Sequence, residues 1–123
     1  MVLDVEIDGI TYPPPSTIYW PFEQTGHEIS GVDGSLSYDN PRLRRICIII
    51  WDRLSVSFYN NILTTIRTTN PAQCYLPLYP GENGPENYSG EFMIRLSTPG
   101  GILWNNFNRL SSVTIELRED RVL

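Results

Sequence analysis

The hydrophobic pattern is densest at residues 46–51, which read ICIIIW without a polar interruption. A strand with one buried face alternates apolar and polar residues, whereas a strand buried on both faces reads as a continuous apolar run. Isoleucines followed by an aromatic residue favour a strand over a helix. We therefore predict that 46–51 is the central strand of the core.

Directly after this run the period of the pattern changes from two to 3.6 residues. Ser55 is suited to cap a helix, and the polar positions that follow are rich in Asn and Thr, which are poor helix formers. We predict a helix around 55–67 that is held by packing its apolar stripe on a sheet. One more strand over 56–66 is the alternative. The stripe consists of Phe58, Ile62, Leu63 and Ile66.

The N-terminal residues 2–12 have the pattern of a β-hairpin. Leu3, Val5 and Ile7 alternate with acidic residues, and Asp8-Gly9 follows them. Both central residues of a type I′ turn need a positive φ, which makes Asp-Gly a strong hairpin signal. A hairpin of two strands is not stable alone, so it must lie on this domain or on a neighbouring subunit.

Shorter strands are predicted in the second half of the chain. Residues 91–97 and 113–119 alternate cleanly between apolar and polar positions. Residues 73–78 form a further predicted strand, which Pro77 places at an edge or at a bend. The segment 80–87 lacks apolar residues and is typical of a solvated loop or hairpin tip. Together these patterns predict a mainly β, antiparallel domain with one helix packed on it.

The segment 13–41 is only weakly periodic. Three consecutive prolines end the first hairpin, because proline cannot donate a ladder hydrogen bond. We predict a long loop segment, with a possible short strand pair at 29–38 around Asp33-Gly34. Loops of this length in compact domains usually serve function or an interface. Residues 98–108 are likewise irregular.

Length and composition bound the class of protein. The chain has 123 residues and 41% hydrophobic residues, which is enough for one globular domain. Its first residues lack the basic and apolar regions of a signal peptide, and no segment is long enough to cross a membrane. Cytoplasmic folding is therefore the expectation, and the two cysteines, Cys47 and Cys74, are expected to be reduced core thiols.

The charge balance argues against general nucleic-acid binding. The net charge is −5, and all nine cationic residues are arginines. Phosphate affinity grows with the number of cations that a protein presents, so an acidic chain of this kind binds nucleic acid poorly. The basic cluster Arg42, Arg44 and Arg45 is interpreted as solvated charge at a strand edge or as a contact with an acidic neighbour.

The sequence offers little for catalysis, and we expect no enzymatic activity, no cofactor and no metal. His27 could be combined with Ser30 and Asp33, but neighbours within one loop rarely supply the geometry of a triad. No phosphate-binding, dinucleotide-binding or metalloprotease motif occurs, and no spacing of His and Cys suggests a metal site. An aromatic set could stack on a sugar, form a subunit contact or anchor the core. It consists of Tyr19, Trp20 and Phe22.

A series of short motifs follows a particular order along most of the chain. In this order of motifs the chain resembles the minor tail proteins, also named distal tail or tail-tip proteins, of phages with long non-contractile tails. The motifs are a hairpin at 5–13 (VEIDGITYP), a Gly/Asp segment at 29–36 (ISGVDGSL), a basic strand at 44–51 (RRICIIIW), a helix start at Leu54-Ser55, a strand entering a Pro-rich loop at 76–80 (LPLYP) and a last strand at 113–119 (VTIELRE).

The resemblance implies an antiparallel β-sandwich, similar to the tail-tube fold, with one flanking helix around 55–67. Such a protein forms a homo-oligomeric ring, six-fold or three-fold, in the virion tail after synthesis in the host cytoplasm. Its expected partners are itself, the tail tube protein and the tip or baseplate hub proteins. DNA would pass through the lumen without specific binding, which suits an acidic protein because like charges repel. No membrane anchor is expected.

The hairpin 2–12 and the segment 13–41 are the predicted inter-subunit elements. Their aromatic residues could equally fill the core of their own subunit. Two other roles stay open: a small β-sandwich that recognises a host carbohydrate or protein, and a head decoration or connector protein. The candidate contact residues are Ile10, Tyr12, Trp20, Phe22, Arg42, Arg44, Trp104 and Phe107.

Overall fold

The computed structural model describes residues 3–30, 36–97, 103–106 and 109–122. Along 22–30, 36–42, 103–106, 109–112 and 120–122 it describes the backbone alone. The elements, in chain order, are β1 (Val5–Ile7), β2 (Ile10–Tyr12), β3 (Thr17–Tyr19), β4 (Phe22–Ser30), β5 (Leu36–Ser55), α1 (Val56–Thr68), β6 (Ala72–Gly81), β7 (Gly84–Leu96), β8 (Leu103–Asn106) and β9 (Arg109–Val122).

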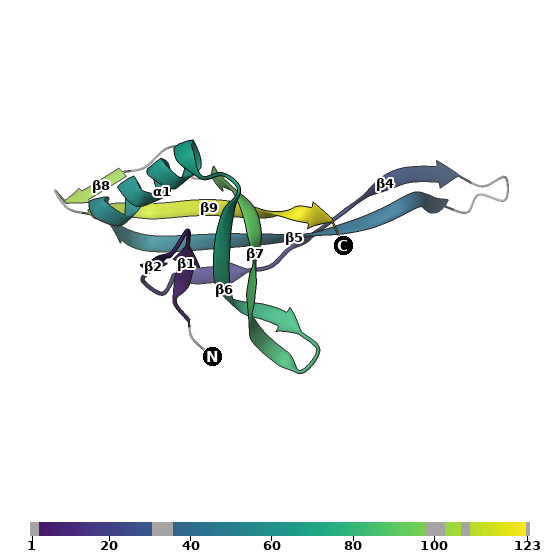
Figure 1. The fold of residues 1–123 in the computed structure, drawn as a ribbon, viewed down its shortest axis with the longest axis horizontal. Coiled ribbons are helices and arrows are strands. Elements are labelled where there is room, and N and C mark those ends of the chain that lie inside the picture. The colour runs from purple at the N-terminus through teal and green to yellow at the C-terminus, as the bar shows by residue number, and fades with distance from the viewer. Residues whose placement is uncertain (1–2, 31–35, 98–102, 107–108, 123) are drawn as a thin grey trace.

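The described strands belong to one nine-stranded sheet in the order β2-β1-β6-β7-β9-β5-β3, with β4 paired to β5 and β8 paired to β9 (Figure 1). All pairings are antiparallel. The predicted mainly β, antiparallel domain with one helix is therefore confirmed. The two facing sheets of a sandwich are not confirmed, because the described strands form a single hydrogen-bonded sheet.

This sheet curls, so that strands far apart in its order meet. The edge strand β3 is separated from β6 by β5, β9 and β7. Nevertheless, the indole Nε1 of Trp20, next after β3, donates to the carbonyl oxygen of Pro77 in β6 at 3.1 Å. The curl gives the sheet an inner face, which holds the core, and an outer face. The core includes Val5, Ile7, Tyr12, Cys47, Ile49, Trp51, Leu54, Ile62, Ala72, Cys74, Leu76, Phe92, Ile94, Val113, Ile115 and Leu117.

Strand β5 contains the predicted 46–51 strand and extends it in both directions. Cys47, Ile49 and Trp51 point inward and are fully buried. Ile48 and Ile50 point outward and are only half-buried. The strand lies between β9 and the edge strand β3 and so is next to the edge of the sheet. The apolar run of β5 therefore exceeds what the described residues of this subunit cover.

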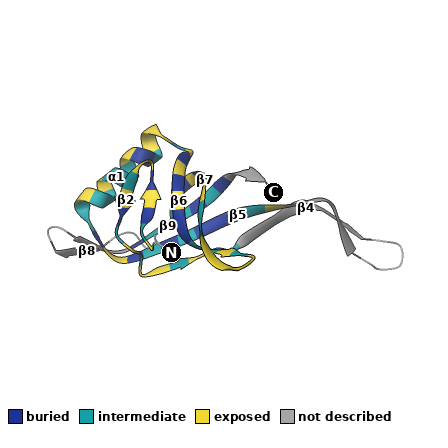
Figure 2. Ribbon diagram, turned by 60° about the horizontal axis from the view of Figure 1, so that its bottom comes forward, coloured by how far each residue is buried: buried dark blue, intermediate teal, exposed yellow. Residues whose placement is uncertain are grey.

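Helix α1 confirms the predicted helix and its cap, and excludes the alternative strand over 56–66. Ser55 has extended backbone angles, and its hydroxyl accepts a hydrogen bond from the Phe58 amide at 3.3 Å. That bond satisfies one of the amide groups that a helix start leaves free. Ile62 is fully buried against the inner face of the sheet, while the exposed residues of α1 face away from the sheet (Figure 2).

The first hairpin forms as predicted, with β1 and β2 joined at Asp8 (φ 53°) and Gly9 (φ 78°). These left-handed angles are those of a type I′ turn. Strand β1 also pairs with β6, so the hairpin lies on its own domain. Val5 and Ile7 are buried, whereas Leu3 is 50% exposed.

Strands β6 and β7 form a long hairpin with its tip at 82–83, as the polar composition of 80–87 indicates. The register shifts between Leu76 and Tyr79, and Leu78 has a left-handed φ of 59°. Pro77 thus marks a bend, one of the two predicted possibilities. The pairing of β6 with β1 covers Cys74 and Tyr75 and does not extend to Pro77.

The segment 13–41 is not the loop that the sequence pattern indicated. It contains β3, β4 and the start of β5. Ile29 pairs with Ser37 and Ser30 with Leu36, so the predicted strand pair at 29–38 exists, while its centre at Asp33-Gly34 lies outside the described residues. Much of β4 pairs with a stretch of β5 that β9 does not reach.

Candidate assembly surfaces

The most distinctive feature of the molecule is an arm formed by β4 and the first part of β5. The two strands run together away from the remainder of the sheet (Figure 1). Residues 36–43 of β5 pair with β4, whereas pairing of β5 with β9 begins at Arg44. At about 3.4 Å per residue the arm extends roughly 25 Å beyond this point. Each strand of the arm has one edge without a partner among the described strands.

The main sheet also ends in two short edges, β2 and β3, each of three residues. An edge strand presents unpaired amide and carbonyl groups, which can pair with a strand of another chain. The protein therefore offers backbone pairing at the β2 edge, at the β3 edge and along the arm.

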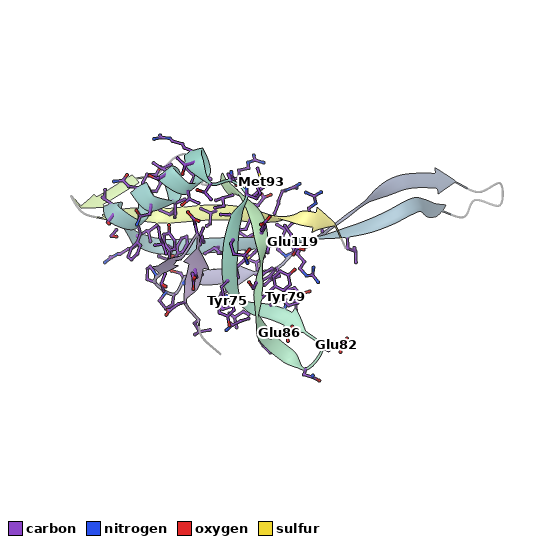
Figure 3. The ribbon with its side chains drawn as sticks, viewed as in Figure 1. Tyr75, Tyr79, Glu82, Glu86, Met93 and Glu119 are labelled. Carbon is purple, nitrogen blue, oxygen red and sulfur yellow. The ribbon has the colours of Figure 1, made fainter. Side chains whose placement is uncertain are left out.

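A cluster around Arg45 lies where the arm joins the body. The Nε of Arg45 donates to the hydroxyl of Tyr79 at 2.7 Å. Its Nη1 lies 3.3 Å from Oε1 of Glu119, which is 2% exposed. Tyr79 of β6 and Glu119 of β9 are labelled in Figure 3. The guanidinium carbon is 4.6 Å from the ring centre of Tyr88, a distance typical of a cation–π contact. The cluster thus joins β5 and β9 to the β6–β7 hairpin.

Aromatic rings enclose this charged pair. Trp20 meets Tyr79 edge-on, with 5.0 Å between ring centres, and Tyr79 lies 4.8 Å from Tyr88. Burial, followed by the hydrogen bond and charge of Glu119, raises the pKa of Tyr88 to about 12. Burial lowers the pKa of Arg45, but the hydrogen bond to Tyr79 and the nearby acidic groups produce a net rise. Tyr88 therefore stays neutral and Arg45 charged at physiological pH.

Within the Arg45 cluster, the guanidinium and the carboxylate of Glu119 compensate each other's charge. Its chemical effect is to neutralise a buried carboxylate and to fix the base of the arm against the β6–β7 hairpin. The sequence contained a signal for this charged cluster. Glu119 continues the inward phase of Val113, Ile115 and Leu117, and a carboxylate in that phase needs a cation.

The candidate contact residues from the hairpin and from Trp20 lie mostly within the subunit. Tyr12 is 1% exposed and packs against Trp51 and Phe58. Ile10 is half-buried against the core, and Trp20 packs in the aromatic cluster. Their side chains thus stabilise the fold of their own subunit.

The remaining candidates lie in or near the arm and β8. The backbone of Phe22 pairs with Arg45, and that of Arg42 pairs with Thr25 in the arm. Arg44 is half-buried, and its Nε has no hydrogen-bond partner among the described side chains. The backbone of Trp104 pairs with Leu110, and Phe107 lies outside the described residues.

The possible sugar-stacking set does not form one platform. Tyr19 is 50% exposed, whereas Trp20 turns inward to the β6–β7 hairpin. Adjacent residues of an extended chain point to opposite sides, so the two rings cannot stack on one sugar.

Two members of the hypothetical triad, His27 and Ser30, are three residues apart in β4, and the structure describes their backbone alone. Asp33 lies outside the described residues. Cys47 and Cys74 are buried free thiols, and burial raises the pKa of both, that of Cys74 to about 12.

Over the described part of the chain, no cluster of His, Cys, Asp and Glu has the arrangement of a metal site. In the same residues, no helix is long and apolar enough to cross a membrane. Comparison of the chain with protein-family models, with curated proteins and with solved structures finds no match.

Proposed function

We propose that this protein is a structural component of a phage tail, which forms a ring between the tail tube and the tip or baseplate hub and leaves a channel for DNA. The observation that carries the proposal is the β4–β5 arm. A two-stranded ribbon gains little stability by itself, so an arm of this length calls for a surface on another subunit. The order of the sequence motifs, which resembles that of phage tail proteins, is the reason for placing this assembly in a tail.

The distribution of edges supports a closed ring of identical subunits. The arm leaves the body on one side of the sheet, and the open edge strand β2 lies at the other end of the sheet order. When one subunit presents two different surfaces to its two neighbours, the contact is heterologous and closes into a ring if the rotation allows. Six-fold and three-fold rings both agree with this arrangement.

The charge of the chain supports a passive relation to DNA. With a net charge of −5, a ring of these subunits adds negative charge around its channel. A like-charged wall repels the phosphate backbone and lets the duplex slide without being held.

The proposal is tested by locating the protein on particles of the virus that encodes it. Antibodies raised against the purified protein, detected with colloidal gold, should mark the far end of the tail. Negative-stain images of the purified protein should show rings with a central opening. Label on heads or necks would instead make it a decoration or connector protein. No label on any particle would refute a virion role.

A further inference from the structure

Prolines lie along several of the open edges of the sheet. Strands β2 and β3 are three residues long; Pro13 directly follows the first, and Pro15 and Pro21 flank the second at a distance of two residues. The stretch of β5 in the arm that β9 does not cover contains Pro41. Proline has no amide hydrogen, and short edges with prolines are poor templates for a strand of another chain.

The projecting part of the β6–β7 hairpin has the same kind of edge. Pairing of β6 with β1 covers Cys74 and Tyr75, and pairing of β7 with β9 begins at Phe92. Beyond these contacts Pro80 of β6 lies opposite Pro85 of β7. Each strand of the projecting hairpin therefore lacks a donor at this position, which makes its open edge incomplete.

Strands β4 and β8 have open edges without this protection. β4 has nine residues and β8 has four, and neither strand contains a proline. Among the described strands, β4 pairs with β5 alone and β8 pairs with β9 alone. The sequence of β8, LWNN, also contains no charged residue, although charge is a common means of keeping an edge strand from pairing. Both edges thus remain available for backbone pairing.

A bulge divides β4 into two regular stretches, 22–25 and 27–30. The register with β5 shifts between Thr25 and His27. Pro21 precedes the first stretch, but its carbonyl oxygen accepts from the Ile46 amide at 3.2 Å, so it is directed to β5 and not to the outer edge. The second stretch pairs with 36–39 and is the more distant from the body. It has four residues, as β8 has.

The arm and β8 lie at opposite ends of the long axis of the molecule (Figure 1). The stretch 27–30 therefore cannot reach β8 of its own chain. At the β8 end, the opposite edge of the sheet belongs to the last residues of β5, where the Asp52 amide already donates to Ser16 Oγ at 2.9 Å. The two proline-free edges are thus placed to meet between copies, one at each end of a subunit.

We propose that stretch 27–30 of one copy pairs, as an added strand, with β8 of the next copy. The arm then becomes three-stranded where the copies meet, which a ribbon of two strands needs for stability. Main-chain hydrogen bonds supply the affinity in such strand addition, so the contact needs no opposite charges between identical acidic subunits. Each copy gives its arm to one neighbour and receives an arm at β8 from the other, which makes the contact heterologous. This inference rests on the proposed ring and names the two edges that join its subunits.

The first test maps the contact by cross-linking. Purified Ile29→Cys and Asn105→Cys chains are mixed and treated with a short bismaleimide, and dimers that contain one chain of each kind should accumulate. The native cysteines, Cys47 and Cys74, are buried free thiols and should not react in the folded chain. Thr11→Cys, at an exposed position of the β2 edge, replaces Asn105→Cys in the control mixture and should give little product. Preferred cross-linking to Thr11→Cys, or no cross-linking to either, would overturn the inference.

The second test blocks the β8 edge with charge. The double variant Asn105→Lys with Asn106→Lys should weaken self-association of the full chain at least about ten-fold in sedimentation velocity, because lysines on an edge strand discourage pairing. Thr11→Lys with Thr17→Lys is the matched control: it adds the same charge at exposed positions of the β2 and β3 edges and should leave the contact intact. Circular dichroism and urea midpoints verify that each variant is folded. A folded β8 variant that associates like the wild type, or a wild-type chain that remains monomeric at millimolar concentration, would refute the pairing.

Gold labelling separates this inference from the proposed function. Label at the tail tip, together with unaffected association of the β8 variant, would refute the two edges and leave the tail role intact. Loss of association in the β8 variant, with no label on particles, would support the edges and refute the tail role.

Discussion

Arg45 and Glu119 form an ion pair between neighbouring strands at the root of the arm, with 3.3 Å between Nη1 and Oε1. The side chain of Glu119 is 3% exposed and that of Arg45 is 18% exposed. Tyr79 and Tyr88 cover the guanidinium and bond to the pair. The carboxylate is therefore removed from water, and Arg45 compensates its charge from a partly exposed position.

Arg45→Met should destabilise the fold by about 3–5 kcal/mol, because it leaves a buried carboxylate without a cation. The double variant Arg45→Met with Glu119→Leu should recover a large part of this loss, since apolar residues of similar volume replace a buried pair at little cost. Urea unfolding followed by tryptophan fluorescence measures both. Arg53→Met, at an exposed position of β5, is the control. Equal losses in the single and double variants would contradict the ion-pair explanation.

Ser55→Ala should cost about 1 kcal/mol in the free energy of unfolding, because the Phe58 amide loses its acceptor. Ser57→Ala is the matched control, since Ser57 is exposed within the first turn of α1 and alanine has the higher helix propensity. The control should be neutral or slightly stabilising. Chemical denaturation of the two variants side by side decides the matter. Equal free energies of unfolding in the two variants would mean that the Ser55 cap contributes nothing.

Gly9→Val should destabilise the β1–β2 hairpin by about 1–2 kcal/mol, because a β-branched residue is strained at a φ of 78°. Asp8→Asn is the control, since asparagine tolerates the left-handed conformation that Asp8 adopts. Hydrogen exchange should show faster opening of β1 in the valine variant than in the asparagine variant. Unchanged protection of β1 would argue that the turn does not set its stability.

Tyr12 should make stability fall as the pH rises above 10. Burial, and then electrostatic interaction with Asp8 and Cys74, raises its pKa from 10.0 to about 12. Between these values the unfolded chain loses the phenolic proton while the folded chain retains it, so the free energy of unfolding decreases with rising pH. Below pH 10 both states are protonated, and this residue contributes no pH dependence.

Tyr12→Phe tests this directly. The buried Oη has no hydrogen-bond partner among the described residues, so its removal should cost little at pH 7. Above pH 10 the variant should lose stability less steeply than the wild type. Some slope should persist, because the pKa of Tyr88 is also raised to about 12. Urea midpoints from pH 8 to 11 give the comparison, and identical slopes would exclude a role for Tyr12.

The sequence predicted correctly those elements that depend on interactions between residues close together in the chain. The cap at Ser55, the Asp8-Gly9 turn and the alternation around Phe92 each reflect a few neighbouring residues, and each agrees with the structure. The curl of the sheet depends on contacts such as that of Trp20 with Pro77, which are far apart in sequence and carry no local period.

The candidate site was less accessible to sequence reasoning. Tyr12 and Trp20 are amphipathic aromatic residues, and only the fold shows that they turn inward. Apart from the strand pair at 29–38, the arm was predicted to be a loop, because its sequence is only weakly periodic. Arg45 was recognised as part of a basic cluster, but its partner Glu119 is distant in the chain and its role needed the register of β5 and β9.

The continuity of β5 has a mechanical consequence. The strand runs from the arm through the core to the helix cap as one 20-residue element, about 65 Å long. A load applied to the arm along the strand therefore reaches β9 as a shearing force, which all of its cross-strand hydrogen bonds resist together. The same load directed sideways would peel β4 from β5 one residue pair at a time. The arm is stiff under axial pull and compliant under bending.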